Sequence, residues 1–505
     1  MVDPILDANQ NRDAYYKRVA PLYGPAFDNK VLGVCGGESA LETALLLARC
    51  GVRSFAIGPG AEALPELLRA QNPWEDRWNF ETLEKARIVV ADSEAPVGFR
   101  SPAPVLRLTI LPANRAVRAR IDAIPAYEAW PTVERAENEE PVSPEAINRL
   151  AALTRAELLR GSPHEPAEAR LLLCSPRTSV LFGHARWPWW IRGFEREAAD
   201  DWIKAQPADE SGKPVSRRGR VLVVGCGSLG SIAAESLAPY VEALILSDPE
   251  RVDLENLVRQ AYEPNEVGRW KAEALAERLA RYGAHTQALM RAEEDTPDGI
   301  RKFGDLLDRF RPDLAILTTG TGAEYAMAVA LRKRGIRHVA ARCYARARFF
   351  ELILVDGANG PCFHCLREQV HTGPAPSLTP EQHARYDPTW RPGELNAEPA
   401  TVLDSGYCAQ ALARAGLELL KPPSERAPWL SETLGQERTC WLGANHAERD
   451  VRGHWAYGID CPGKLVTFGV EDIVGAAPGE RCSVCGREWL PEKRSDSGKE
   501  LAAGA

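Results

Sequence analysis

Two cysteine pairs of the form Cys-x-x-Cys lie far apart in this 505-residue chain: Cys362 with Cys365, and Cys482 with Cys485. Each pair offers two thiolates on one tight turn, and two such turns complete a tetrahedral zinc site. Their separation is too long for a zinc finger but suits a clasp between distant loops of one domain. Four thiolates leave no open coordination position, so we expect zinc here to stabilise the fold. A redox role is the alternative, although it does not explain two matched pairs.

A glycine loop precedes the cysteine pairs. Gly225, Gly227 and Gly230 form the pattern Gly-x-Gly-x-x-Gly directly after the apolar residues 221–224. The first glycine permits a tight turn, the second lets backbone N–H groups approach phosphate oxygens, and the third lets a helix pack closely. Asp248 ends the next apolar run, where a carboxylate can accept hydrogen bonds from ribose hydroxyls. These residues alone fit an NAD-dependent oxidoreductase equally well.

The segment after Asp248 favours a different chemistry. It reads Asn-Leu-Val-Arg-Gln over residues 256–260 and Gly-Arg-Trp-Lys-Ala over residues 268–272. An acid, an Asn-Leu-x-Arg-Gln block and a Gly-x-x-Lys-Ala helix start, in this order, resemble the ThiF-like adenylyltransferases. This superfamily activates ubiquitin-like and sulfur-carrier proteins and includes the ubiquitin-activating enzymes. The resemblance is closest over residues 220–271 and extends to the cysteine pairs.

The resemblance implies a reaction and its cofactors. In this family a carboxylate attacks the α-phosphorus of ATP and pyrophosphate leaves. Charge grows on the phosphate oxygens, and fixed cations stabilise that charge. ATP, Mg²⁺ and a structural Zn²⁺ on the four cysteines are the implied cofactors. The implied site residues are Arg259 and Lys271 holding the phosphates, Asn256 and Gln260 orienting them, and Asp248 holding the ribose.

The chain departs from the family pattern at the magnesium ligand. The family carries an aspartate after its fourth strand, and here Thr318 or Thr321 stands in that place. Magnesium prefers oxygen ligands of higher charge than a hydroxyl. Glu324 or Glu250 are the alternative ligands, and impaired ATP turnover is the third interpretation.

The acyl-accepting nucleophile and the crossing arginine are also uncertain from the sequence. Residues 366–407, where an acceptor cysteine often lies in the family, contain no cysteine. Cys408 fits a buried helix position, which leaves Cys440 and Cys461 as thioester candidates beside direct handoff to a partner's thiol or amine. An arginine from a neighbouring adenylation fold commonly reaches the ATP, and Arg12 and Arg18 are the candidates here.

An internal repeat indicates the elements that position these residues. The stretch from Val31 lines up with the stretch from Val221, and each predicts a strand, a small-residue turn and an Ala- and Leu-rich helix. A second strand follows in each copy, at 54–58 and at 243–248. Such strand–helix–strand units open a doubly wound sheet. A later strand over 86–92 matches the one over 313–319.

The first copy has lost the residues that would do chemistry. Cys35 and Ala40 stand in place of the first and third glycines, and Pro59 stands where the second copy has Asp248. We therefore predict an α/β protein with two Rossmann-like, doubly wound ThiF-type adenylation folds in tandem, the second with a structural zinc site. The predicted parts are a degenerate fold over 1–135, a connecting module over 136–205, an active adenylation domain over 206–492 and a tail over 493–505.

Composition narrows the class of protein. The formal net charge of −8 disfavours a nucleic-acid partner, and no apolar run is long enough to cross a membrane. Met1 starts a segment without the basic and apolar regions of a secretory signal, so we expect a cytoplasmic protein with zinc-binding or buried cysteines rather than disulfides.

The sequence predicts ATP-dependent adenylation of the C-terminal carboxylate of a small ubiquitin-like or sulfur-carrier protein. Thioester transfer and handoff to a conjugating enzyme are further steps left open. The chain would form a pseudo-dimer within itself, with a homodimer also open, and it resembles bacterial ubiquitin-like conjugation systems that act in antiviral defence. The alternatives are adenylation of a peptide carboxylate in natural-product biosynthesis, and a pseudoenzyme that presents a carrier or precursor peptide to a partner.

Overall fold

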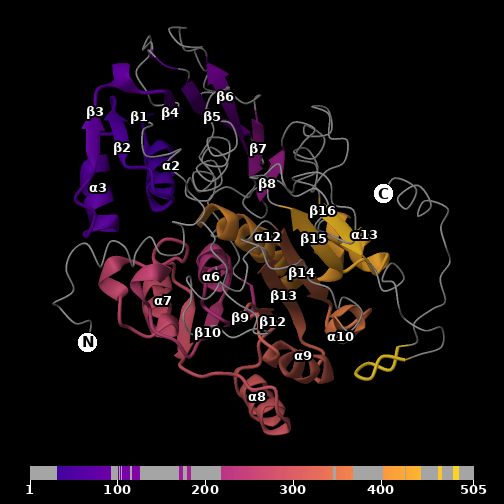
Figure 1. The fold of residues 1–505 in the computed structure, drawn as a ribbon. Helices are drawn as coiled ribbons and strands as arrows, with labels where there is room; N and C mark the ends of the chain where they lie inside the picture. The colour runs from indigo at the N-terminus through magenta and orange to yellow at the C-terminus, as the bar shows by residue number, and fades with distance from the viewer. Residues whose placement is uncertain are drawn as a thin grey trace, which may run out of the picture. The chain divides into compact units, whose positions relative to one another are not determined.

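The computed structural model describes two sheets and the helices around them (Figure 1). The described residues are 31–92, 101, 103, 105–113, 116–124, 170–174, 179–182, 218–344, 349–367, 402–426, 428–444, 465–468 and 481–487. The chain divides into two compact units. The first comprises Met1–Ser216, Arg251–Arg269 and Pro399–Tyr407, and the second comprises Arg217–Glu250, Trp270–Glu398 and Cys408–Ala505.

The first sheet has the strand order β3-β2-β1-β4-β5-β6-β7-β8. Its strands up to β5 pair in parallel, and β5 to β8 continue the sheet with antiparallel pairs. Its elements are β1 (Val31–Cys35), α2 (Glu38–Arg49), β2 (Ser54–Ile57), α3 (Leu64–Gln71), β3 (Asn79–Glu81), η1 (Leu83–Lys85), β4 (Ile88–Asp92), β5 (Val105–Ala113), β6 (Ala116–Ile124), β7 (Arg170–Cys174) and β8 (Ser179–Phe182).

The second sheet has the order β11-β10-β9-β12-β13-β14-β15-β16, parallel up to β13 and antiparallel beyond it. Its strands are β9 (Arg220–Val224), β10 (Ala243–Ser247), β11 (His285–Leu289), β12 (Leu314–Leu317), β13 (Arg337–Tyr344), β14 (Phe349–Val355), β15 (Cys440–Ala444) and β16 (Leu465–Phe468). Its helices are α6 (Gly230–Leu237), α7 (Lys271–Ala280), α8 (Pro297–Phe310), α9 (Ala323–Lys333), α10 (Phe363–Arg367), α12 (Val402–Leu420) and α13 (Pro428–Gly435). Short 3₁₀ turns are η2 (Ala238–Tyr240), η3 (Leu254–Asn256), η4 (Pro264–Glu266) and η5 (Pro423–Glu425).

The two sheets follow one strand order, which confirms the doubly wound α/β class predicted from the repeat. β4 holds the same place beside β1 that β12 holds beside β9, as the matched segments predicted. That the first sheet is a degenerate adenylation fold stays a prediction. β7 and β8 fall in the stretch expected to be a connecting module, yet they pair with the first sheet.

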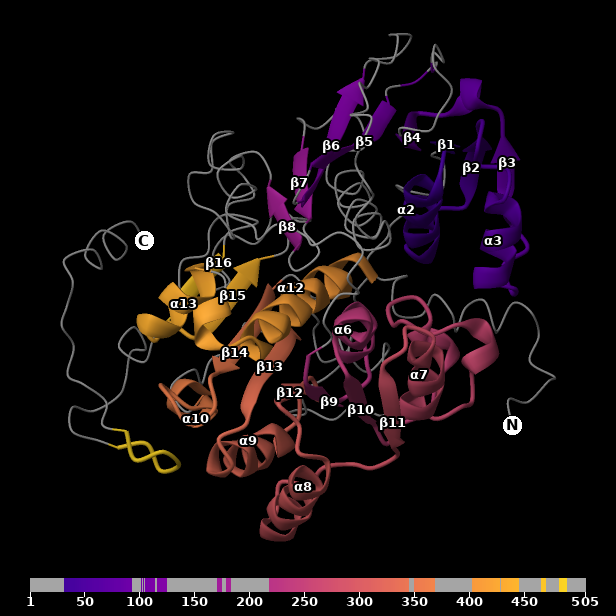
Figure 2. The same cartoon turned by 180° about the vertical axis from the view of Figure 1, so that it is seen from behind.

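The second sheet is buried on both faces, which is why its strands read as nearly continuous apolar runs. On one face, Phe303 and Leu307 of α8 and Leu331 of α9 pack in one core cluster with alternate residues of β9, β12 and β14. On the other face, α12 runs across the sheet, as Figures 1 and 2 show. A Cβ on Gly416 of α12 would lie 3.1 Å from Leu314 and 3.2 Å from Ile316 of β12. The absence of a side chain at Gly416 therefore lets this helix approach closely.

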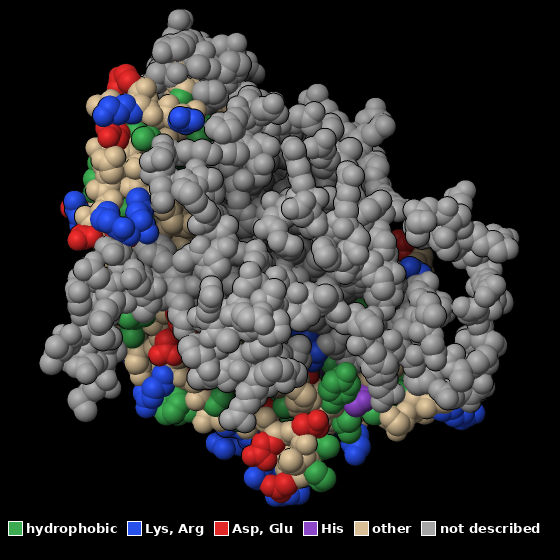
Figure 3. Space-filling model, in the orientation of Figure 1, with side chains coloured by type: hydrophobic (Ala, Val, Ile, Leu, Met, Phe, Trp, Pro, Cys, Tyr) green, Lys and Arg blue, Asp and Glu red, His purple; other side chains and the backbone are tan. Residues whose placement is uncertain are grey.

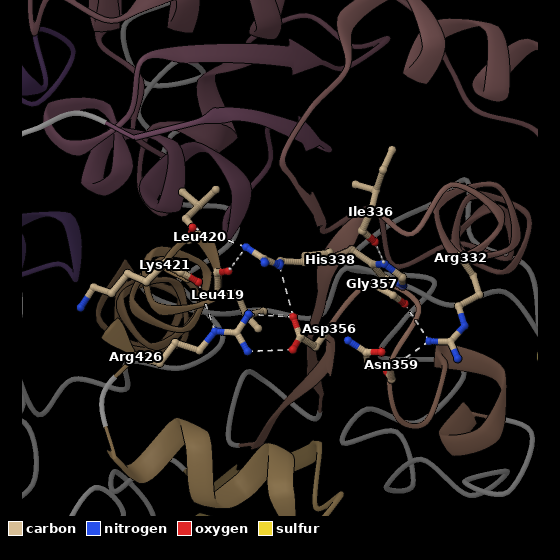
Figure 4. A network of polar contacts seen from close by, with 11 residues as sticks. Arg332, Ile336, His338, Asp356, Gly357, Asn359, Leu419, Leu420, Lys421 and Arg426 are labelled. Atoms are coloured by element: carbon tan, nitrogen blue, oxygen red, sulfur yellow. Dashed lines mark hydrogen bonds and ion pairs between the residues drawn. The ribbon is translucent and has the colours of Figure 1, made fainter. Parts of the chain in front are cut away.

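A network of arginines and Asp356 fixes the carboxyl end of α12 (Figure 4). Arg426 donates from Nη1 and Nη2 to the two Asp356 carboxylate oxygens, at 2.7 and 2.8 Å. Arg337 lies 3.2 Å from the same carboxylate and donates at 2.9 Å to the Leu419 carbonyl. These cations satisfy carbonyls that an ending helix leaves without partners and complement its negative end.

The solvent face of α8 carries charges of both signs. Arg301 pairs with Asp298 at 2.6 Å and with Asp305 at 3.2 Å, and Lys302 pairs with Asp298 at 2.7 Å. Figure 3 shows acidic and basic side chains intermixed at the lower end of the view, where α8 lies. Among the helices of the described residues, none is long and apolar enough to cross a membrane.

We expect Arg426→Met to lower the free energy of unfolding by about 3 kcal/mol, because it leaves a partly buried carboxylate with a weaker partner. The Arg426 side chain is 3% exposed and Asp356 is 17% exposed. Arg218→Met is the matched control, since its pair with Glu425 is 40% and 47% exposed and should cost less than about 1 kcal/mol. Denaturant unfolding of the two variants measures both values, and equal losses would contradict the assignment.

Candidate nucleotide site and cysteine cluster

Strand register brings the predicted site residues of the second sheet to one edge. Val224, the last residue of β9, pairs with Ser247 of β10 and with Leu317 of β12. All three strands are parallel, so the residues that follow them leave the sheet side by side. These residues are Gly225, Asp248 and Thr318. The carboxyl edge of a doubly wound sheet, at the point where strand order reverses, is where such folds bind ligands.

The glycine loop has the geometry predicted for its first and third glycines. Gly225 has φ +91°, a left-handed conformation that favours glycine, and its N–H donates to the Ser247 carbonyl at 2.8 Å. A Cβ on Gly230 would lie 1.8 Å from the Gly225 carbonyl oxygen, so only glycine lets α6 start so close to the turn. A Cβ on Gly227 would meet nothing within 4 Å. The protein's own packing therefore does not require glycine at position 227.

Asp248 is buried at the edge, with 5% of its surface exposed. Its Oδ2 accepts from the Cys226 N–H at 2.6 Å, and its Oδ1 accepts from the Glu250 N–H at 2.8 Å. Burial raises the pKa of the Asp248 carboxyl, and the Lys271 charge and the two N–H donors act against that rise. Asp248 thus orients the glycine loop directly, a role beyond the ribose contact predicted for it.

Lys271, at the start of α7, is 4% exposed. Its Nζ lies 2.5 Å from Oε2 of Glu250, whose side chain is 68% exposed. The Lys271 charge also acts on Asp248 and on the Cys226 thiol. A buried ammonium thus stands beside the glycine loop with a solvent-exposed partner, and a phosphate can take over the place of that partner.

The structure distinguishes between the candidate magnesium ligands by the contacts that each one makes. Glu324 is fully buried: Oε1 accepts from Gly320 N at 2.8 Å and Thr319 Oγ1 at 3.2 Å, and Oε2 accepts from Arg342 at 2.9 and 2.5 Å. Thr318 donates from Oγ1 to the Gly225 carbonyl at 2.7 Å. Both side chains are therefore occupied by the protein's own contacts.

Exposed carboxylates at this edge include those of Glu250 and Asp295. Glu250 is the one that the sequence had suggested. Asp295, which the sequence did not suggest, is exposed and follows β11; a Cβ on Gly322 would lie 3.6 Å from its Oδ2. Thr321 is exposed in the loop between β12 and α9, and its Oγ1 lies 3.1 Å from Oγ1 of Thr319.

The Asn-Leu-Val-Arg-Gln block lies in the segment Arg251–Arg269 of the first compact unit. Val252 and Gly268 close this segment by backbone hydrogen bonds, with Gly268 N donating to Val252 O at 2.8 Å. Asn256 forms a capping box with Asp253, whose N–H donates to the Asn256 side chain at 3.0 Å. The side-chain oxygen of Asn256, a residue predicted to orient the phosphates, is thus used within the turn.

The other two predicted site residues of the block are also buried. Arg259 is 8% exposed and Gln260 is 3% exposed. Among the described residues, the side-chain Oε1 of Gln260 is buried and has no hydrogen-bond partner. Arg49 of α2, which the sequence did not suggest, donates from Nη1 to the Gln260 carbonyl at 3.3 Å. The predicted crossing arginines Arg12 and Arg18 lie outside the described residues.

The four predicted metal ligands come together. Cys362 Sγ lies 3.7 Å from Cys365 Sγ and 3.6 Å from Cys482 Sγ, and Cys365 Sγ lies 3.4 Å from Cys485 Sγ. All four sulfur atoms lie within 4.8 Å of one another. Zinc bonded to four sulfurs at about 2.3 Å separates them by about 3.8 Å, so the donor set and its spacing fit tetrahedral zinc.

Of the two cysteines proposed as acyl acceptors, the structure describes Cys440, and it is buried. Cys440 lies on β15, 1% exposed within the core cluster of the second sheet, which contradicts a mobile nucleophile. Cys408 is buried on α12, as predicted, and burial raises the pKa of its thiol, as does its contact with Cys343. Cys461 lies outside the described residues.

The fold and its edge define a Rossmann-like α/β domain with a glycine loop. Residues 203–389 match the ThiF family model, so this part of the chain is a ThiF family domain, and the ThiF-like resemblance is confirmed. The match covers the glycine loop, the Asn-Leu-Val-Arg-Gln block and the first cysteine pair. It supports an ATP-dependent adenylyltransferase as the class of this domain.

Solved structures similar to the chain include three at low identity. E. coli MccB with MccA-N7isoASN is 16% identical at a TM-score of 0.37, over 53% of this chain and 67% of that one. The microcin C7 biosynthetic enzyme MccB in complex with N-formylated MccA is 15% identical at 0.37, over 53% and 67%. PaaA is 15% identical at 0.34, over 51% and 74%. No curated protein matches the chain. At these TM-scores the likenesses define neither substrate nor partner.

We expect Gly230→Ala to destabilise the protein by about 2 kcal/mol or more, because the new methyl group collides with the Gly225 carbonyl. Gly227→Ala should change stability by less than about 0.5 kcal/mol, since its methyl group meets only open space. The same variant should weaken ATP binding about tenfold, by blocking the approach of phosphate to the backbone. Thermal unfolding and binding of a fluorescent ATP analogue measure the two effects. Unchanged affinity in Gly227→Ala would contradict the assignment.

We expect the purified chain to carry zinc, and Cys482→Ser to lose most of it, because one of four thiolates is removed. Chelation of zinc from the unmodified chain should lower its unfolding temperature. Elemental analysis and thermal unfolding make the measurements, with Cys343→Ser as the control cysteine outside the cluster. A metal-free protein of unchanged stability would refute the zinc assignment.

Proposed function

We propose that the edge formed by Gly225, Asp248 and Lys271 binds ATP and that the protein adenylates a carboxylate. The carrying observation is the register of β10, β9 and β12, which brings the glycine loop and the buried Asp248 to one edge of a ThiF family domain. The buried Lys271 acts on Asp248 from the start of α7. A lone glycine loop would suit several nucleotides. The adjoining Lys271 and the Asn-Leu-Val-Arg-Gln block favour phosphoryl chemistry.

In this proposal, some residues bind the nucleotide and others stabilise the charge that develops on its phosphates. The α6 N-terminus and the open approach at Gly227 receive phosphate oxygens, where N–H groups and the helix dipole favour an anion. Asp248 accepts from the ribose while it orients the loop. Lys271 exchanges its partner Glu250 for phosphate and stabilises charge as pyrophosphate leaves. By the same proposal, Arg259 and Gln260 act on the triphosphate and Asn256 shapes their turn.

Glu250 and Asp295 are the residues proposed to hold the Mg²⁺ that accompanies ATP. Both offer exposed carboxylate oxygens, the ligand type that magnesium prefers. When bound, the ion neutralises the β- and γ-phosphate charge. Zn²⁺ on the four cysteines would clasp α10 and the turn at 482–485 in one place, without taking part in the reaction.

The proposed substrate is the C-terminal carboxylate of a small ubiquitin-like or sulfur-carrier protein that ends in glycine. Because Cys440 is buried, we favour direct handoff of the acyl-adenylate to a partner's thiol or amine. A peptide carboxylate of a biosynthetic precursor is the alternative substrate, and it requires the same adenylation chemistry.

A binding protein without turnover is the second candidate, and one observation favours it. Thr321 stands where the family's magnesium aspartate is expected, while Glu324 is held by Arg342 and cannot replace it without breaking a buried ion pair. Such a chain would bind nucleotide or carrier and present it to a partner.

We expect ATP–pyrophosphate exchange that requires a carrier or peptide with a free C-terminal carboxylate. Lys271→Ala should reduce exchange at least about 100-fold, because the buried cation beside the phosphates is lost. Glu250→Gln should raise the magnesium concentration that exchange requires. Arg301→Ala is the control, because Arg301 is exposed on α8 and pairs with Asp298 and Asp305 of the same helix. Exchange intact in Lys271→Ala would exclude its phosphate role, and ATP binding without exchange for any carboxylate would favour the binding protein.

A further inference from the structure

Helix α9 touches the cysteine cluster and the nucleotide edge within two consecutive residues. Glu324 holds the loop Thr318–Gly322 through Gly320 N and Thr319 Oγ1. Tyr325, the next residue, accepts at its carbonyl from Nε2 of His364 at 3.1 Å. His364 lies between Cys362 and Cys365 in the chain. Glu324 and Tyr325 thus connect the Cys362–Cys365 turn to the loop Thr318–Gly322, which contacts the glycine loop.

Ring packing reinforces the contact between α9 and the cysteine turn. The Tyr325 ring meets Phe363 edge to face at 5.3 Å and 81°, and meets His364 at 5.2 Å and 76°. Phe363 is 1% exposed and belongs to the same core cluster as the cysteines. Displacement of the turn would therefore move Tyr325, because a close-packed core has no space to absorb it.

The far end of α9 holds the approach to the cysteine turn. Arg332 donates to the carbonyls of Gly357 at 2.7 Å and Asn359 at 3.2 Å (Figure 4). It also donates to the Gly360 carbonyl at 3.1 Å. Gly357 and Gly360 both have φ +65°. This guanidinium fixes the glycine-containing segment that leads into Cys362. One end of α9 therefore contacts the cysteine turn, and the other end contacts the segment before it.

The loop held by Glu324 is joined to the nucleotide edge. Arg342 of β13 binds Oε2 of Glu324 through two nitrogens and is itself 8% exposed. The other carboxylate oxygen fixes Gly320, and Thr318 of the same loop donates to the Gly225 carbonyl at 2.7 Å. A shift of α9 would thus reach the turn that precedes Gly227.

We propose that α9 couples the four-cysteine cluster to the nucleotide edge, with Glu324 and His364 as positioning residues. Metal held by the cysteines and nucleotide bound at Gly225–Gly230 then stabilise each other, because coupling between two binding sites is reciprocal. This inference rests on the proposed function for its nucleotide and on the fit of the cysteines for its metal. It assigns the zinc clasp a role in nucleotide affinity as well as in folding.

The test measures zinc release from the full chain into a chromophoric chelator, with and without a saturating ATP analogue that cannot be cleaved. We expect nucleotide to slow zinc release at least about fivefold. Zinc-free protein should bind the analogue more weakly than zinc-loaded protein, by the same factor by which the analogue raises the zinc affinity measured by chelator competition. His364→Ala should keep four cysteines, zinc and nucleotide binding, but lose the protection, because its hydrogen bond to Tyr325 is gone. His364→Gln, which retains a donor, should recover part of it.

His285→Ala is the matched control, since this histidine is exposed on β11 and should leave protection unchanged. Glu324→Gln should weaken nucleotide binding and remove protection while zinc content stays the same. Nucleotide that binds without slowing zinc release from the unmodified chain would overturn this inference alone. Failure of the analogue to bind at all would overturn it together with the proposed function.

Discussion

The close approach of α6 to the end of β9 is the constraint on which the edge depends. The 1.8 Å that would separate a Gly230 Cβ from the Gly225 carbonyl leaves space for hydrogen only. That approach points the α6 N-terminus along the edge. It also leaves the Cys226 N–H to be satisfied by Asp248 and the Gly225 carbonyl by Thr318, at 2.6 and 2.7 Å. The turn therefore fixes the ends of β10 and β12 as well as its own.

Charge at this edge follows from that geometry. Asp248 and Lys271 are both buried, so each needs a compensating partner. Asp248 obtains its partners from backbone N–H groups, and Lys271 obtains Glu250, which is exposed and strongly hydrated. Glu250 loses little free energy when it releases Lys271, because its exposed carboxylate stays hydrated. Lys271 is buried, so its ammonium stays at the edge when Glu250 leaves. A cation fixed in place with an exchangeable partner is suited to receive a phosphate.

The sequence predicted the parts of this arrangement that depend on local spacing. The glycine loop, the strand–helix–strand units and the Cys-x-x-Cys turns each lie within a few residues, and their geometry follows from residue type. Long-range contacts had no such signal: the Glu324–Arg342 pair joins a helix to a strand, and nothing in either segment marks it. The sequence left the role of Cys440 open, because its burial depends on β15 pairing between β14 and β16, with Cys440 opposite Ile353 and Phe468. The capping box of Asp253 and Asn256 could have been predicted from the sequence, because the two residues have the three-residue spacing of this motif.

The threonine expected in place of the family's magnesium aspartate, Thr318 or Thr321, lies in the loop that the Glu324–Arg342 pair holds. A buried carboxylate orders this loop, because Glu324 holds Gly320 and Thr319 before any ligand arrives. Arg342 balances the charge and ties the loop to β13. The loop is therefore held by the protein's own contacts without magnesium. The carboxylates that we propose for magnesium, Glu250 and Asp295, follow β10 and β11 instead. Under this proposal, different residues order the loop and bind the ion.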